Sequence, residues 1–300
     1  MHVVTGATGH TGRVVAERLL AGQKKVRVIG RSVERLEPLT RRGAEAWISD
    51  LTDPQRLAEA LEGAEAAYVL LPPDLSATNY RTYQDRISDV LAAAIQQAGV
   101  TRVVSLSSFG ADKAAGTGPV VGLHYLEQKL NQIPRLDVLH LRAGYFMENT
   151  LAQIGIIKTM GVLAGPLRAE RELPMIATRD IGEFAAQALL KLNFVGHETR
   201  ELQGARDVSM AEVASIIGRA IGRPQLSYKQ LPDEQVRAAL LESGLSKDAA
   251  DLILEMSQAI NTGHMAALEK RSKDNTTPTS YEQFLKEVFV PQFKGQPAVA

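Results

Sequence analysis

Three glycines near the N-terminus constrain the fold of this chain more than any other feature. Residues 6–12 read GATGHTG, which has the spacing G-x-x-G-x-x-G, and they lie between a short apolar run and a helical pattern that begins near Arg13. Glycines so placed permit a tight turn, a close approach of the backbone to a pyrophosphate, and close packing of helix on strand. Amide groups at the start of the helix, assisted by its dipole, then face the phosphates. The motif therefore predicts a dinucleotide-binding turn, rather than a loop that merely needs positive φ angles.

Short apolar runs and amphipathic stretches alternate through the first half of the chain. Strand patterns occur at residues 3–4, 26–29, 44–48, 66–71, 102–106 and 137–141, and helical patterns at 13–21, 32–42, 54–61, 80–98 and 122–132. Parallel strands need a crossover connection, which is usually a helix. The alternation therefore predicts an α/β fold with a doubly wound parallel Rossmann sheet.

The regular alternation of strand and helix patterns ends after Arg142. Glycines and a proline interrupt the pattern between residues 155 and 166, and helical patterns follow at 181–192, 210–221, 233–241 and 249–261. This part predicts a smaller, helix-rich C-terminal lobe. We therefore expect an NAD(P)-binding Rossmann domain at residues 1–150 and a substrate-binding lobe at 151–300, with some of its segments returning to the sheet.

Composition excludes several classes of function. The 34 Lys and Arg residues balance 34 Asp and Glu residues, so no net positive charge attracts nucleic acid. The chain has no cysteine, so redox chemistry must come from a bound cofactor. No signal peptide and no apolar run of about 20 residues are visible, and no histidines and carboxylates occur at metal-ligand spacing. We expect a cytoplasmic protein that binds a small-molecule substrate, but no membrane, nucleic acid or metal.

The end of the second predicted strand bears on the choice of cofactor. Arg31 and Ser32 follow this strand, and no acidic residue occurs there before Glu34. A site selective for NAD usually places a carboxylate at this point, whereas an arginine accommodates the 2′-phosphate of NADP. The charge pattern favours NADP(H) over NAD(H). The alternative is that Arg31 is only a solvent-exposed loop charge.

Five segments together resemble one known family. They are VTGATGHTG at 4–12, VSLSSFGA at 104–111, LRAGYFMEN at 141–149, PMIATRDIG at 174–182 and TTPTS at 276–280. With these motifs the chain resembles the NmrA-like branch of the atypical short-chain dehydrogenase/reductase superfamily over nearly its whole length.

The resemblance implies a set of cofactor-binding residues. The turn residues Gly6, Thr8, Gly9, His10, Thr11 and Gly12 would bind pyrophosphate, Arg31 and Ser32 the 2′ end of the adenosine, and Asp50 and Leu51 would flank the adenine. Leu71, Pro72, Ala143, Gly144 and Tyr145 would line the nicotinamide half.

The catalytic residues implied by the resemblance are less simple. The superfamily uses Ser, Tyr and a Lys four residues after the Tyr, and Tyr125 and Lys129 have that spacing. In NmrA-like chains, however, the basic residue lies about five helical turns of sequence before the arginine of the LRAGY motif. His124 lies 18 residues before Arg142, whereas Lys129 lies only 13 before it. On that register His124 takes the place of the lysine and Val120, which cannot donate a proton, that of the tyrosine.

Two interpretations therefore stay open for this helix. His124 is either a cofactor- or substrate-contacting basic residue, suited to proton relay near neutral pH, or a residue whose hydrogen bonds are satisfied locally. A working Tyr125/Lys129 pair is the further alternative. Ser107 remains a catalytic candidate because it lies at the carboxyl end of its predicted strand, where ligands bind in such sheets.

The resemblance implies an NAD(P)H-dependent oxidoreductase that transfers a hydride to a small quinone-like or carbonyl acceptor. The absence of a tyrosine at position 120 leaves a second hypothesis, a non-catalytic NAD(P)-sensing regulator that acts through a protein partner.

Overall fold

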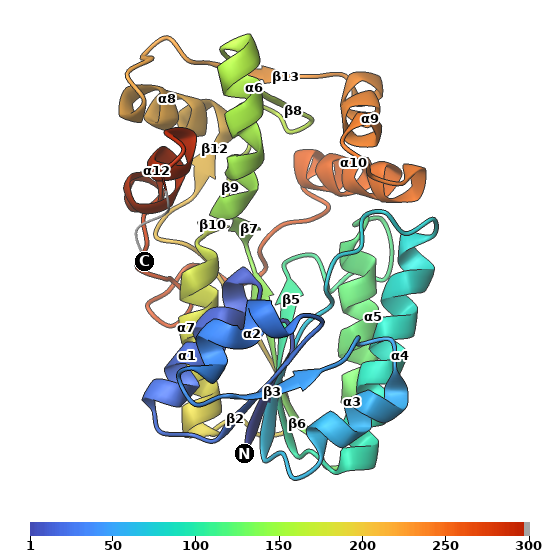
Figure 1. Ribbon diagram of the computed structural model, residues 1–300. Coiled ribbons are helices and arrows are strands. Elements are labelled where there is room, and N and C mark those ends of the chain that lie inside the picture. Colours follow the sequence, from blue (N-terminus) through green and yellow to red (C-terminus); the bar gives the residue numbers. More distant parts are fainter. Residues whose placement is uncertain (297–300) are drawn as a thin grey trace.

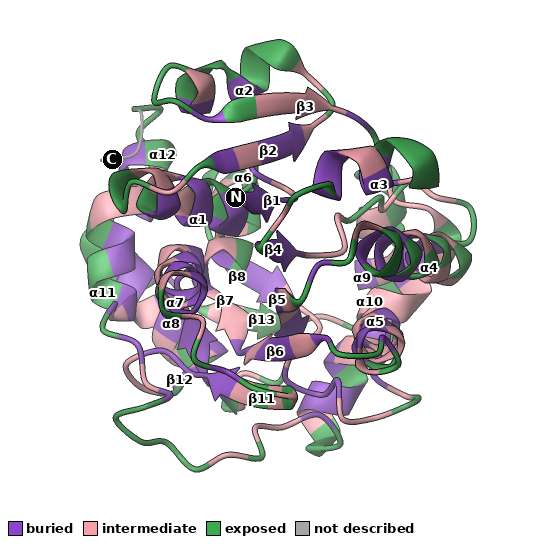
Figure 2. Cartoon of the chain, turned by 90° about the horizontal axis from the view of Figure 1, so that it is seen from below, coloured by how far each residue is buried: buried purple, intermediate pink, exposed green. Residues whose placement is uncertain are grey.

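The computed structural model describes residues 1–296, and its centre is a seven-stranded sheet (Figures 1 and 2). The strands are β1 (His2–Val4), β2 (Val26–Gly30), β3 (Glu45–Ile48), β4 (Ala66–Val69), β5 (Arg102–Ser108), β6 (Asp137–Ala143) and β11 (His197–Leu202). Their order is β11-β6-β5-β4-β1-β2-β3, and all neighbours pair in parallel. The predicted doubly wound parallel sheet is confirmed. The direction of winding reverses between β1 and β4, which makes the carboxyl end of these strands the expected place for a ligand.

Helices cover both faces of this sheet. One face carries α1 (His10–Ala21), α2 (Val33–Thr40) and α7 (Thr178–Lys191), and the other carries α3 (Pro54–Leu61), α4 (Tyr80–Ala98) and α5 (Val120–Asn131). The central strands β1 and β4 are buried along their whole length because helices cover both of their faces, whereas the edge strands β3 and β11 are partly exposed. Each face has its own apolar core, and the sheet separates the two.

A second body of short elements lies over the carboxyl edge of the sheet (Figure 1). Its helices are η1 (Met147–Ala152), α6 (Gln153–Met160), α8 (Met210–Ala220), α9 (Asp233–Glu242), α10 (Lys247–Thr262), α11 (Tyr281–Phe284), the π-helical turn η2 (Leu285–Phe289) and α12 (Val290–Phe293). Three strand pairs join them: β7 (Tyr145–Phe146) with β10 (Met175–Ile176), β9 (Glu172–Leu173) with β12 (Val208–Ser209), and β8 (Leu163–Gly165) with β13 (Tyr228–Gln230). A third apolar core holds this lobe together.

Two elements from the second half of the chain belong to the sheet rather than to the lobe. Helix α7 packs on α1, and β11 adds an edge strand beside β6. The chain thus leaves the sheet after β6, enters the lobe, and returns for α7 and β11 before it finishes in the lobe.

The contact between α1 and α7 is unusually close. A Cβ atom added at Gly182 would lie 2.6 Å from the Cβ of Val14 and 2.8 Å from the backbone oxygen of Thr11. Only a residue without a side chain fits at this crossing. The position of Gly182 therefore fixes α7 against the helix that carries the glycine-rich turn.

We predict that Gly182→Ala destabilises the fold by about 1–3 kcal/mol, because the added methyl group overpacks the α1–α7 crossing. Gly155→Ala in α6 is a matched control, since nothing lies within 4 Å of its added Cβ; it should be neutral or stabilising by up to about 1 kcal/mol. Urea unfolding measures both. Equal stability of the two variants would contradict the close packing.

Candidate functional site

The turn between β1 and α1 has the geometry that its glycines predict. Gly6 has a φ of +60°, and the amide of Gly9 donates to the carbonyl oxygen of Gly6 at 2.9 Å. A Cβ atom at Gly12 would lie 2.4 Å from that same oxygen. The turn is therefore folded back on the start of the helix, with no room for a side chain between them.

Helix α1 begins without a side-chain cap. Its N-cap residue is Gly9, and its first turn holds no acidic residue. By contrast, a Ser, Asp or Asn side chain caps α2, α3, α4, α8, α10 and α11. Amides at a helix start need partners, and this helix starts at the carboxyl edge of the sheet, where an anion can supply them.

A polar groove of about 300 Å³ runs from this turn past the ends of β2 and β3. The predicted residues that line it are Gly6, Thr8, Arg31, Ser32, Asp50, Leu51 and Pro72. Arg35 lines it as well and was not predicted from the sequence. The spacing R-S-x-x-R was the available signal, because it places Arg35 in the first turn of α2. Within residues 1–296 neither arginine forms an ion pair with the protein.

Ser32 is engaged within the chain. Its hydroxyl oxygen accepts the amide of Arg35 at 3.2 Å, which caps α2, and its proton goes to Glu34 at 2.6 Å. This hydrogen bond lowers the pKa of the exposed Glu34 carboxyl. The two arginines, rather than Ser32, therefore offer charged hydrogen-bond donors to the groove.

The other residues that were predicted to bind the cofactor lie in three different places. Gly9 ends the turn, and His10, Thr11 and Gly12 begin α1, where the hydroxyl of Tyr68 donates to the buried Thr11 at 2.9 Å. Leu71, Gly144 and Tyr145 line a second cavity, whereas Ala143 is fully buried in β6 and lines neither.

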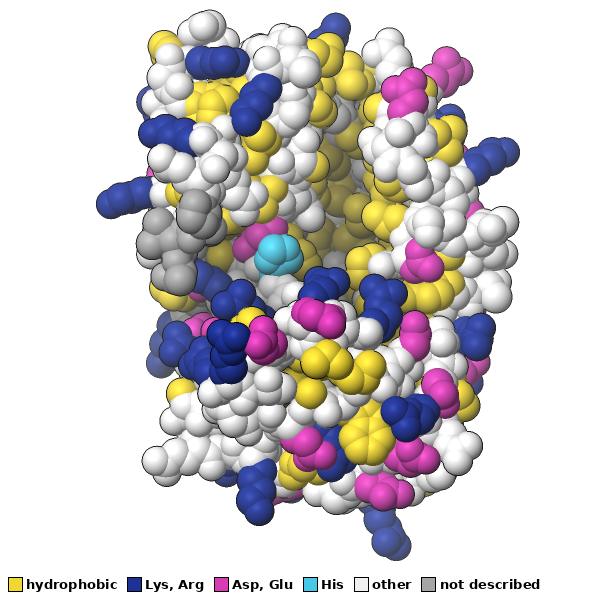
Figure 3. Space-filling model, viewed as in Figure 1, with side chains coloured by type: hydrophobic (Ala, Val, Ile, Leu, Met, Phe, Trp, Pro, Cys, Tyr) yellow, Lys and Arg dark blue, Asp and Glu magenta, His cyan; other side chains and the backbone are white. Residues whose placement is uncertain are grey.

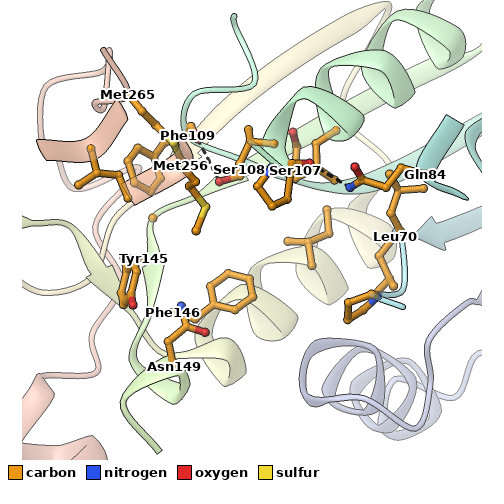
Figure 4. A pocket seen from close by; sticks show the side chains of 18 of the residues that line it. Leu70, Gln84, Ser107, Ser108, Phe109, Tyr145, Phe146, Asn149, Met256 and Met265 are labelled. Carbon is orange, nitrogen blue, oxygen red and sulfur yellow. Dashed lines mark hydrogen bonds between the residues drawn. The ribbon is translucent and has the colours of Figure 1, made fainter. Parts of the chain in front are cut away.

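The second cavity, called here the apolar cavity, has a volume of about 360 Å³ and lies between the sheet and the lobe (Figures 3 and 4). Its apolar lining is Leu70, Leu71, Pro73, Leu106, Phe109, Pro119, Val120, Leu123, Phe146, Met256, Ile260 and Met265. Figure 4 shows Met256 and Met265 on the side opposite Leu70 and Gln84. Pro73 lines both the apolar cavity and the polar groove, so the two adjoin.

Two phenols stand among this apolar lining. Burial raises the pKa of Tyr80 to about 12. Burial also raises the pKa of Tyr145, although a hydrogen bond with Asn149 acts in the opposite direction. Both hydroxyls therefore keep their protons at neutral pH.

A buried ion pair lies behind the cavity wall. Arg142 donates to both carboxylate oxygens of Glu127, at 3.0 and 2.6 Å, and Ser107 donates to Glu127 at 2.6 Å. Burial opposes the charge of Arg142, but its hydrogen bonds and attraction to Glu127 outweigh this and raise the pKa of the guanidinium. Sequence reasoning missed Glu127. The feature that could have indicated Glu127 is a carboxylate on the helix that precedes the arginine of the LRAGY motif.

The structure separates the predicted catalytic residues. Ser107 lines the apolar cavity, as does Val120. Tyr125 and Lys129 both contact Asp89 of α4, at 3.0 and 2.7 Å, and line neither the apolar cavity nor the polar groove. The Nδ1 atom of His124 lies 2.8 Å from the carbonyl oxygen of Ala111, and His124 lines neither space. The catalytic roles of these side chains stay predictions.

Fold and site together define a Rossmann protein with a polar groove and an adjoining apolar cavity at the carboxyl edge of its sheet. The sequence profile of the NmrA-like family matches residues 2–285. The chain therefore belongs to the NmrA-like family, as its motifs predicted.

Several relatives are similar over almost the whole chain. The (4-alkanoyl-5-oxo-2,5-dihydrofuran-3-yl)methyl phosphate reductase of Streptomyces griseus is 28% identical over 270 residues, which are 89% of this chain and 90% of the relative. The NADPH-dependent quinone oxidoreductase of Escherichia coli, solved with NADPH, has a TM-score of 0.80 at 22% identity, covering 96% of this chain and all of that one. The triphenylmethane reductase of Citrobacter sp., solved with NADP(H), has a TM-score of 0.77 at 18% identity, covering 95% and 99%.

Metal-ligand clusters and membrane-spanning helices are both absent from residues 1–296. No group of three or more His, Cys, Asp or Glu side chains there is arranged to hold a metal ion. No helix in the same range has the length and apolar character needed to cross a bilayer.

We predict that Arg142→Met destabilises the protein by about 3–5 kcal/mol, because it leaves the Glu127 carboxylate buried without its charge partner. The double variant Arg142→Met/Glu127→Met should cost less than the sum of the two single changes. Urea unfolding of the four proteins gives the coupling energy. Additive losses would show that the two charges do not depend on each other.

Proposed function

We propose that this chain is an NADP(H)-dependent oxidoreductase that reduces a small quinone-like or carbonyl acceptor. The observation that carries the proposal is the pair of adjoining spaces at the switch point of the sheet. One is polar, starts at an uncapped helix and holds two unpaired arginines; the other is apolar. Such a pair suits a dinucleotide beside an apolar substrate.

The residues of the polar groove fit the cofactor. Because Gly12 has no side chain, the turn can fold back onto the start of α1, and the amides at the start of α1 would bind a pyrophosphate. Arg31 and Arg35 would hold a 2′-phosphate, for which two guanidinium groups are better suited than one carboxylate. The structures of two NmrA-like reductases with NADPH or NADP(H) support this choice.

The apolar cavity fits the acceptor. When bound, a reduced nicotinamide supplies a hydride, so the protein itself must bind the acceptor and exclude water. The lining from Leu70 to Met265 does both, because it is largely apolar on the sheet side and on the lobe side. Relatives named as quinone and triphenylmethane reductases support a flat, apolar acceptor. Since Val120 cannot donate a proton, solvent would protonate the reduced product once it leaves the cavity.

We expect the protein saturated with NADPH to oxidise it when a suitable quinone, aldehyde or imine is added. Loss of nicotinamide absorbance against a panel of these acceptors measures the reaction. Gly12→Ala should bind NADPH poorly and turn over little, because its Cβ would lie 2.4 Å from the oxygen of Gly6.

The same experiment separates the enzyme from the second candidate function, a non-catalytic NAD(P)-sensing regulator with a protein partner. The position of Val120 in the cavity wall favours this candidate. Tight cofactor binding without turnover of any acceptor would contradict the oxidoreductase. A sensor must in addition bind the oxidised and reduced cofactor with different affinities or change conformation between them.

We expect Arg31→Ala to weaken NADPH binding by about tenfold or more, because a charge-assisted contact to the 2′-phosphate is lost. NADH binding should not change. Titrations of both cofactors by calorimetry test this, with Arg86→Ala as the control for charge, since Arg86 is an exposed residue of α4 that lines neither space. Equal affinities of the wild type for NADPH and NADH would refute the cofactor preference.

A further inference from the structure

We propose that Ser107 is a fixed hydrogen-bond acceptor in the wall of the apolar cavity, and that the cavity therefore selects aromatic ligands that carry a hydroxyl group. The inference rests on the proposed function, because it names the chemistry of the ligand in the same cavity. It concerns binding, however, and does not require that the ligand be reduced.

The direction of the hydrogen bond between Ser107 and Glu127 is set by charge. The two oxygens lie 2.6 Å apart, and both carboxylate oxygens of Glu127 already accept protons from the Arg142 guanidinium. An ionised carboxylate can only accept hydrogen bonds. The proton in this contact must therefore be that of the Ser107 hydroxyl.

The burial of this network keeps it in place. Ser107 is 3% exposed and Glu127 is 2% exposed. In such surroundings a charged acceptor binds a hydroxyl proton roughly twice as strongly as a neutral one. Rotating the hydroxyl toward the cavity would leave a buried carboxylate without one of its donors, which is costly. Ser107 therefore offers lone pairs, and no proton, to a ligand.

Two neighbouring side chains also direct a donor to a backbone carbonyl group. Ser108 donates its proton to the carbonyl oxygen of Phe109 at 3.0 Å, and Gln84 donates to the carbonyl oxygen of Pro119 at 2.9 Å. The amide oxygen of Gln84 is buried without a protein partner. All three side chains line the apolar cavity, and Figure 4 shows Ser107, Ser108 and Gln84 along one side of it. Ser107 and Ser108 thus turn hydroxyl oxygens, rather than hydroxyl protons, toward this side of the cavity.

The wall discriminates between two kinds of ligand oxygen. A carbonyl or ether oxygen beside Ser107 would place its lone pairs against those of the serine. A hydroxyl group would instead donate a proton to Ser107 while its ring contacts the apolar lining. The ligand class is therefore a hydroxylated aromatic compound, with any carbonyl group turned away from this wall.

Calorimetric titration of the protein without cofactor tests the proposal, using 4-methylphenol and 4-methylanisole as matched probes. We expect the wild type to bind the phenol tighter by about fivefold or more, which is the effect of one net hydrogen bond. Ser107→Ala should reduce this ratio to about one. Ser257→Ala should retain it, because it also deletes a buried hydroxyl, one bonded to the carbonyl oxygen of Ile253, but lies outside the cavity lining.

The Glu127→Gln variant is a second test of the proposal. Its amide group can donate to Ser107, which frees the serine proton to face the cavity, so the ratio should fall or reverse. If this variant does not fold, Ser107→Ala decides alone. Equal affinities of the wild type for the two probes, or an unchanged ratio in Ser107→Ala, would overturn the proposal.

The outcome is independent of turnover. A preference for the phenol with no oxidation of NADPH by any acceptor would refute the proposed oxidoreductase and leave the ligand chemistry standing. Turnover without the preference would refute only the role of Ser107.

Discussion

The contact between Gly6 and Gly12 is the constraint on which the rest of the structure depends. Because the two backbones touch, α1 starts directly at the carboxyl edge of β1 and leaves its first amides open to that edge. The same helix is met by α7 at Gly182 with equally little room. The position of the turn is therefore fixed from both sides, and a preorganised anion site needs such rigidity.

Different parts of the chain cover the two halves of the carboxyl edge of the sheet, and the two spaces there differ in character as a result. Past β2 and β3 the groove is lined by the turn, by the start of α2 and by the segment after β4, and four of its lining side chains are charged. Beyond β4 and β5, the lobe covers the edge of the sheet. Met256 and Ile260 of α10 and Met265, which follows α10, line the apolar cavity there. Under the proposed function, a charged cofactor and an apolar ligand would lie next to each other because two different parts of the chain line one edge.

Most of this fold could be predicted from the sequence because buried parallel strands and amphipathic helices leave different periodicities. The edge strand β11 was missed, since its sequence HETREL is polar and lacks the apolar run of a central strand. The short pairs of the lobe, such as β8 with β13, were missed because two- or three-residue strands carry no periodic signal.

The site was predictable where the chemistry is local and not where it depends on the orientation of a helix. The groove residues follow their strands directly, so their place at the carboxyl edge could be inferred. The spacing of Tyr125 and Lys129 places both on one face of α5, but it does not say which face meets the ligand. In the structure that face meets Asp89 of α4, while Val120 and Leu123 line the cavity.

The buried pair of Glu127 and Arg142 has a consequence for the kind of reaction that this cavity can support. Two buried charges are costly in desolvation and contribute little net stability, but they hold the proton of Ser107 away from the ligand. Val120 offers no proton, and the raised pKa values of Tyr80 and Tyr145 make both phenols weak acids. A reaction that needs a strong acid at the moment of reduction is therefore disfavoured. Under the proposed function, an acceptor whose reduced form is a delocalised anion, as with a quinone, needs no such acid and is therefore favoured over a simple ketone.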